Sequence, residues 1–105
     1  MSIQQIQSII EGSIKVKQAL LKDEQLVLEI EKIVHAITHA FKQGNAVYFA
    51  GNGGSAADAQ HLAAEFSGRF YKDRKALPSD ALHCNSSYLT AVANDYSYDV
   101  IYSRL

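Results

Sequence analysis

The stretch AVYFAGNGGSAADAQHLAAEFSGRF, residues 46 to 70, constrains the fold of this chain more than any other. Its first five residues form a short, continuously apolar run, which is typical of a strand buried on both faces of a parallel sheet. The loop Gly-Asn-Gly-Gly-Ser follows directly, and a helix-forming segment comes next. A strand, a glycine-rich turn and a helix in this order predict an α/β fold with parallel strands and right-handed crossovers.

Two amphipathic helices are predicted before this stretch. Apolar residues recur at spacings of three and four from Ile3 to Ile14 and are continued by Leu20 and Leu21, and a second stripe runs from Leu26 to Phe41. The second helix is expected to begin near Asp23 and to end at Gly44, where a C-terminal glycine belongs. We therefore expect residues 1–44 to be a helical segment.

The rest of the chain continues the alternation of strands and helices. A second apolar run, ALHCN at residues 81–85, predicts another strand, and residues 86–95 and 98–105 have helical patterns. Two parallel strands leave both sheet edges unpaired and normally need further strands beside them. We therefore expect residues 45–105 to form the first βαβα part of a single larger domain.

The glycine-rich loop is a candidate anion site. Gly51, Gly53 and Gly54 permit positive φ and a close approach to a ligand, and Ser55 is predicted to be the N-cap of the helix, with Asp58 as a weaker capping-box acid. Backbone N–H groups at a helix N-terminus favour phosphate. A tight turn without a ligand explains the glycines equally well. The loop matches neither the dinucleotide fingerprint nor the P-loop.

The helix after the loop carries a candidate metal or proton-transfer pair. Its predicted buried face contains Ala59, Leu62, Ala63 and Phe66. Asp58, His61 and Glu65 share a neighbouring face, one turn apart. An imidazole and a carboxylate at this spacing suit zinc, and they also suit proton transfer. The alternative is an exposed ion pair that contributes a few tenths of a kcal/mol.

Composition excludes several classes of function. The chain has a formal net charge of -1, and its basic residues cluster only in YKDRK at residues 71–75, so we expect no nucleic-acid partner. The N-terminus does not resemble a signal peptide, and no stretch is long and apolar enough to span a membrane. Cys84 is the single cysteine, which excludes an internal disulfide and favours a reducing, cytoplasmic location.

Three histidines and the cysteine are expected to be structural or surface residues rather than parts of a functional site. His35 and His39 are expected at the surface of the second helix, and no further metal ligand stands near them in the sequence. His83 is expected to be a hydrogen-bonded residue of the core or its boundary. Cys84 is expected to be a small buried hydrophobic residue.

Three segments together resemble the sugar isomerase (SIS) domain and, within it, the phosphoheptose isomerases: GNGGSAADAQHLAAEFSGRF, RKALPSDAL and LTAVANDYSYDVIYSR. The similarity covers almost all of residues 30–105. It implies a three-layer αβα sandwich with a parallel, flavodoxin-like sheet, and N-terminal helices that assemble a homotetramer. It also implies isomerisation of D-sedoheptulose 7-phosphate to D-glycero-D-manno-heptose 7-phosphate, which supplies heptose for bacterial lipopolysaccharide and capsule.

The resemblance assigns roles to individual residues. His61 and Glu65 correspond to ligands of one Zn²⁺ per subunit, and Glu65 also to the group that transfers the proton. Arg69 corresponds to a residue that either supports the pocket or lies at the surface. The implied sugar-phosphate contacts are Asn52, Gly53, Gly54, Ser55, Glu65, Asn94 and Asp95. A second phosphate loop, and the Gln and His that complete the zinc site, belong to a later part of the family's domain that these 105 residues do not contain.

A non-catalytic SIS binding module is the alternative. In the replication-initiator-associating type, the position matching Glu65 is apolar and the loop departs from Gly-Gly-Ser, whereas both are retained here. SIS domains that sense sugar phosphates usually accompany a DNA-binding segment, and none is found in this sequence. The retained residues favour the enzyme.

Overall fold

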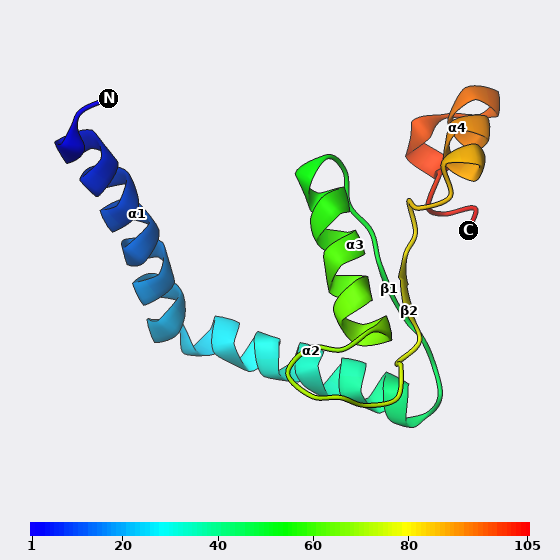
Figure 1. Cartoon of the computed structure of the whole chain (residues 1–105), viewed down its shortest axis with the longest axis horizontal. Coiled ribbons are helices and arrows are strands. Elements are labelled where there is room, and N and C mark those ends of the chain that lie inside the picture. The colour runs from blue at the N-terminus through cyan, green and yellow to red at the C-terminus, as the bar shows by residue number, and fades with distance from the viewer. The chain divides into compact units, whose positions relative to one another are not determined.

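The computed structural model describes all 105 residues, which form two compact units, Met1–Thr38 and His39–Leu105. The elements are α1 (Ile3–Lys22), α2 (Glu24–Lys42), β1 (Val47–Phe49), α3 (Gly54–Ser67), β2 (Ser79–Ala81), α4 (Ser86–Asp95) and the short 3₁₀ helix η1 (Tyr98–Val100) (Figure 1). The predicted order of helices and strands is confirmed. None of the helices combines the length and the hydrophobicity that crossing a membrane requires.

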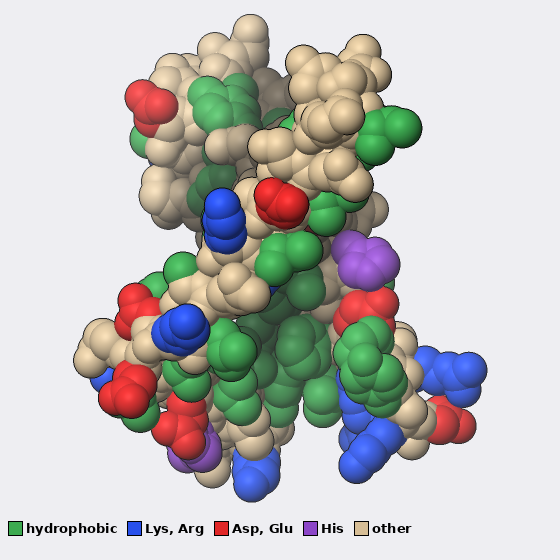
Figure 2. Space-filling model, turned by 90° about the vertical axis from the view of Figure 1, so that its left-hand side faces the viewer, with side chains coloured by type: hydrophobic (Ala, Val, Ile, Leu, Met, Phe, Trp, Pro, Cys, Tyr) green, Lys and Arg blue, Asp and Glu red, His purple; other side chains and the backbone are tan.

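The first unit consists of α1 and most of α2. Ser2 and Gln5 form a capping box at the start of α1: the Gln5 backbone N–H donates to Ser2 Oγ (3.2 Å), and the Ser2 backbone N–H donates to Gln5 Oε1 (2.7 Å). Neither helix contains a buried residue, so the apolar stripes lie at the surface, with Ile10 54% and Ile33 57% exposed. On the face of the whole chain that Figure 2 draws, hydrophobic side chains lie at the surface among acidic and basic ones.

The second unit is built on a two-stranded parallel sheet. Val47 of β1 pairs with Ser79 of β2, and Phe49 pairs with Ala81. Helix α3 packs on both strands, as Figure 1 shows. Three alanines, Ala59 and Ala63 of α3 and Ala81 of β2, are each 4% exposed and form the core with Phe49 against them. Their small side chains let the helix lie close to the sheet.

An aromatic cluster extends this core. The Phe66 ring lies 5.2 Å from the Phe41 ring and 6.0 Å from the Phe49 ring, between centroids. The predicted burial of Ala59 and Ala63 is confirmed, and Phe66 is half-buried. The predicted burial of Leu62 is wrong, because α3 covers only two short strands and the buried stripe is narrow; Leu62 is 46% exposed.

The second strand lies earlier in the sequence than predicted. It covers Ser79–Ala81 rather than residues 81–85, and Leu82 makes the last ladder contact by donating its N–H to Phe49 O (2.9 Å). The chain then turns, with Cys84 N–H bonded to Ala81 O (3.3 Å), and the Asn85 side chain caps α4. Cys84 is therefore exposed on a turn, and the prediction that it is buried is wrong.

The C-terminal segment is less helical than its pattern predicts. Residues 98–105 contain the three-residue η1 followed by turns, not an α-helix. Ile101, 1% exposed, is the most deeply buried large side chain of the segment. Tyr88 of α4 donates its hydroxyl to Ile101 O (3.1 Å), which ties the segment to that helix.

Candidate functional site

The glycine-rich loop joins the carboxyl end of β1 to the first turn of α3. A Cβ on Gly51 would lie 2.4 Å from the Ser55 backbone oxygen, so only glycine fits there. Gly53 has a φ of 56° and is the N-cap of the helix. In parallel sheets, ligands usually bind at the carboxyl ends of the strands, which is where this loop lies.

The predicted cap at Ser55 is wrong. Helix α3 begins at Gly54, because Ser55 N–H bonds to Asn52 O (3.0 Å) and the N–H groups of Ala56 and Ala57 bond to Gly53 O. No side chain caps the helix, and Asp58 is exposed and takes no part in a capping box. The Ser55 hydroxyl is left exposed in the first turn, where it can donate to a ligand.

The loop presents N–H donors at the helix N-terminus. The N–H groups of Asn52, Gly53 and Gly54 have no acceptor within the chain. Residues 52–55 are all exposed. Unbonded N–H groups and the positive end of the helix dipole favour an anion such as phosphate.

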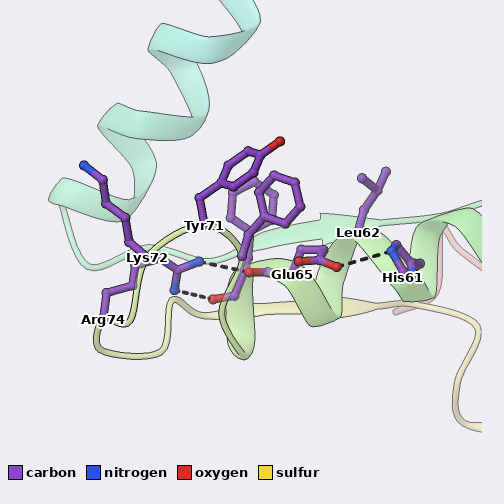
Figure 3. A pocket seen from close by; sticks show the side chains of 8 residues that line it. His61, Leu62, Glu65, Tyr71, Lys72 and Arg74 are labelled. Carbon is purple, nitrogen blue, oxygen red and sulfur yellow. Dashed lines mark hydrogen bonds and ion pairs between the residues drawn. The ribbon is translucent and has the colours of Figure 1, made fainter.

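His61 and Glu65 meet on α3, as their spacing predicts. His61 Nε2 lies 3.2 Å from Glu65 Oε1, and Figure 3 shows the carboxylate directed along the helix toward the imidazole. The His61 side chain is 77% exposed and the Glu65 side chain 30% exposed. Asp58 does not join them, since no group of three His, Cys, Asp or Glu side chains gathers anywhere in the chain.

The pair fits part of a zinc site. Zinc bonds of about 2.0–2.2 Å in tetrahedral geometry place two ligand atoms about 3.4 Å apart, close to the observed separation of the two side-chain atoms. An imidazole nitrogen and a carboxylate oxygen are both zinc donors. His61 and Glu65 can therefore supply two ligands, and the remaining ligands have to come from outside this side-chain pair.

A pocket of about 660 Å³ opens beside this pair (Figure 3). His61 and Glu65 lie on its wall, and Lys72 directs its ammonium group away from them. The other lining residues are Leu62, Phe66, Phe70, Tyr71 and Arg74. Sequence reasoning did not identify this aromatic wall, whose members Phe70 (60%) and Tyr71 (91%) are largely exposed.

Arg74 secures the end of the helix that carries the pair. Its guanidinium donates to Glu65 O (2.9 Å) and Phe66 O (2.8 Å), and also to the carbonyls of Gly68 and Lys75. A cation that bonds the last carbonyls stabilises a helix C-terminus. For Arg69 the sequence left open a support of the pocket or a surface position, and the structure places it at the surface, where it makes no hydrogen bond or ion pair.

Asn94 and Asp95 lie at the end of α4 and are exposed. Asn94 Nδ2 donates to Asp95 Oδ1 (3.1 Å), and neither side chain forms a hydrogen bond with the glycine-rich loop. Tyr98, three residues further on, does reach that loop by donating its hydroxyl to Asn52 Oδ1. The structure thus links the end of α4 to the loop through Tyr98, a residue that the sequence led us to expect in a core or a subunit interface rather than at the site.

The predictions for the other three histidines are confirmed for two of them and wrong for the third. His35 and His39 are exposed on α2, as predicted, and His35 lies 4.0 Å from Glu31. His83 is half-buried, but its Nδ1 atom is buried without a hydrogen-bond partner, so the prediction of a satisfied histidine is wrong.

Curated proteins similar to this chain are phosphoheptose isomerases. The chain is 52% identical to that of Aneurinibacillus thermoaerophilus and 50% identical to that of Clostridium acetobutylicum, each over 99 residues. Both comparisons cover 94% of this chain and 50% of the relative. The chain therefore spans about half the length of the curated relatives that it matches.

Solved structures and a family comparison agree with this similarity. A phosphoheptose isomerase from Francisella tularensis superimposes with a TM-score of 0.89 at 30% identity, covering 99% of this chain and 53% of that one. The phosphoheptose isomerase from Neisseria gonorrhoeae superimposes with a TM-score of 0.82 at 34% identity, covering 96% of this chain and 51% of that one. The SIS domain matches residues 12–105, which include the parallel strands, the glycine-rich loop and the His61–Glu65 pair. The chain belongs to the SIS domain family.

Proposed function

We propose that this chain provides the sugar-phosphate loop and the His61–Glu65 pair of a cytoplasmic aldose–ketose isomerase. The reaction is the interconversion of D-sedoheptulose 7-phosphate and D-glycero-D-manno-heptose 7-phosphate, which would supply heptose for bacterial lipopolysaccharide or capsule. One observation carries the proposal: a single helix, α3, has a loop of unbonded backbone N–H groups at its N-terminus and an imidazole–carboxylate pair two turns later. The sequence identities of 52% and 50% to two phosphoheptose isomerases support the proposal.

The loop suits the phosphate end of the substrate. Asn52, Gly53 and Gly54 offer unbonded N–H groups, and Ser55 adds an exposed hydroxyl. Such donors at a helix N-terminus stabilise a phosphate dianion. Asn94 and Asp95 are proposed to contact the hydroxyl groups of the sugar.

The spacing along α3 suits a long sugar phosphate. His61 lies seven positions after Gly54, which is about 10 Å along a helix. Side chains on a helix lean toward its N-terminus, so His61 and Glu65 lean toward the loop. A seven-carbon chain with a terminal phosphate can bridge this separation and bring its carbonyl end to the pair.

Glu65 has the chemistry that the isomerisation needs. A base must take the proton from the carbon beside the carbonyl, and a proton must return to the neighbouring carbon. The Glu65 carboxylate is half-buried on the pocket wall, and its backbone is held by Arg74. A zinc ion held by His61 and Glu65 would supply electrostatic stabilisation of the enediol oxygen. A carboxylate that stays bound to the metal is a weak base, so a second proton-transfer group is expected outside these residues.

We also propose that α1 and α2 pack against other copies of the chain in a homotetramer. The apolar stripe of α1 contains Ile3, Ile6, Ile10 and Ile14, all between 45% and 72% exposed. Patches of this kind are unusual on monomeric proteins and favour helix packing in a bundle.

The direct test is incubation of the full-length protein with D-sedoheptulose 7-phosphate in D₂O, followed by NMR. An isomerase that works through an enediol forms the aldose and incorporates deuterium at the carbon that receives the proton. Binding of the sugar phosphate without product or deuterium incorporation would support the binding-module alternative instead.

A further inference from the structure

Two tyrosines from the C-terminal segment hold the glycine-rich loop. Tyr98 donates its hydroxyl to Asn52 Oδ1 (2.5 Å), and Tyr102 donates its hydroxyl to Gly51 O (3.0 Å). These partners are 46 and 51 residues apart in the sequence, yet the two hydroxyls reach consecutive loop residues. The loop is thus fastened at the two positions that precede its N-cap glycine.

The segment that carries the tyrosines is itself anchored. The side chain of Ile101, which lies between them, is 1% exposed. The hydroxyl of Tyr88 in α4 donates to Ile101 O (3.1 Å). Ile101 is therefore held both by burial of its side chain and by the hydrogen bond to its carbonyl. This fixes the segment that carries the two tyrosines, and a precise binding loop requires such support.

The bond from Tyr98 decides which end of the Asn52 amide faces outward. A side-chain amide has one oxygen acceptor and an NH₂ group with two donors. Because the oxygen accepts from Tyr98, the NH₂ group is directed away from the tyrosine, and no acceptor in the chain engages it. Two exposed N–H donors suit a phosphate oxygen or a sugar hydroxyl.

The bond from Tyr102 acts in the same way on the backbone. A trans peptide is planar, with its C=O and its N–H on opposite sides. Since Gly51 O accepts from Tyr102, the N–H of Asn52 points away from Tyr102, and it has no acceptor within the chain. The backbone N–H and the side-chain NH₂ group of Asn52 are therefore both oriented by tyrosines.

We propose that Tyr98 and Tyr102 are positioning residues for sugar-phosphate binding, and that Tyr98 acts by orienting the Asn52 amide with its NH₂ group toward the substrate. This inference rests on the proposed function, since it assigns the loop to the sugar phosphate. Neither tyrosine transfers a proton in it. Tyr98 is 50% exposed, so loss of its hydroxyl leaves the ring in place and exposes no buried polar group of its own.

The test compares tyrosine variants of the full-length protein by calorimetric titration with D-sedoheptulose 7-phosphate. Tyr98→Phe is expected to raise Kd about five- to tenfold, the effect of one hydrogen bond, while kcat stays within about twofold of wild type. Tyr48→Phe is the matched control, because Tyr48 is 61% exposed and its hydroxyl makes no hydrogen bond. A Kd for Tyr98→Phe equal to that of the control would overturn the inference.

A double-mutant cycle separates positioning from general support of the fold. If Tyr98 acts through Asn52, then Tyr98→Phe raises Kd in the wild-type background but has no further effect in Asn52→Ala. If the Kd of the double variant instead rises by the product of the two single-variant increases, Tyr98 does not act through Asn52. That result would overturn the inference while leaving the proposed function intact. A wild-type protein that does not bind the sugar phosphate would instead overturn the proposed function, and the inference with it.

Discussion

His61 Nε2 and Glu65 Oε1 lie 3.2 Å apart on adjacent turns of α3. A second histidine–glutamate pair in the chain, His35 and Glu31, has the same spacing along α2, but its atoms are 4.0 Å apart and both side chains are more than half exposed. The two pairs differ in what surrounds them, because His61 and Glu65 line the pocket described above and lie on the helix that follows the glycine-rich loop, whereas Glu31 and His35 do not. The pair on α2 is therefore a built-in control for the pair on α3.

Replacement of His61 tests the metal assignment. His61→Ala removes a nitrogen donor, so we expect the zinc content of the purified full-length protein to fall, with activity falling as a consequence. Added zinc should restore part of the activity if the other ligands keep their geometry. Metal analysis by mass spectrometry measures the content directly, with His35→Ala as the control. Equal zinc content in both variants would remove His61 from the metal site.

Replacement of Ser55 tests the phosphate loop. Ser55→Ala removes an exposed hydroxyl from the first turn of α3, and we expect KM for the sugar phosphate to rise about tenfold or more, as for a hydrogen bond to a charged group. Stability should change by less than about 0.5 kcal/mol, because the side chain caps nothing. Ser86→Ala, at the first residue of α4, is the control. An unchanged KM in steady-state assays would exclude the hydroxyl from the site.

Arg74 is expected to stabilise the fold. Its guanidinium donates to two carbonyls in the last turn of α3 and to two carbonyls beyond the helix. Arg74→Gln should therefore lower the free energy of unfolding by about 1.5–3 kcal/mol. Arg69→Gln removes the same charge from an exposed side chain and should cost less than about 0.5 kcal/mol. Urea denaturation of the two variants measures the difference. Equal midpoints would mean that the carbonyl contacts contribute nothing to stability.

The apolar stripe of α1 predicts self-association. Ile10→Glu places a charge in the stripe, and we expect it to shift the protein toward monomer in sedimentation velocity at micromolar concentration. Ser8→Glu adds the same charge to the opposite, polar face of the same helix and should leave the assembly unchanged. A wild-type protein that sediments as a monomer would contradict the proposed tetramer.

The order of the elements could be predicted from the sequence because it depends on local patterns. Apolar spacings define α1, α2 and α3, and a continuous apolar run defines β1. The second strand was misplaced because Ser79 and Asp80 pair with β1 through their backbones and carry no apolar signal. The predicted cap at Ser55 is wrong because Gly53, at positive φ, is the N-cap and the helix begins at Gly54, before the serine that a cap rule selects.

The candidate site was predictable only where its residues are near in sequence. The spacing of His61 and Glu65 on one helix is local, and the glycine-rich loop adjoins that helix. The contact between Tyr98 and Asn52 joins residues 46 positions apart, and no periodicity encodes it. The role of Arg74 could be predicted only weakly from the sequence, on the ground that basic residues after a helix often bond the carbonyls at its C-terminus.

Turnover of Glu65→Gln in the full-length protein tests the central claim most directly. The substitution keeps the shape of the side chain and removes its charge, so we expect kcat to fall by at least about two orders of magnitude, the scale of a positioned acid–base group, while the sugar phosphate still binds through the loop. Glu31→Gln should match wild type. Activity of Glu65→Gln near that of wild type would reduce the pair to a surface contact and favour a binding module over an isomerase.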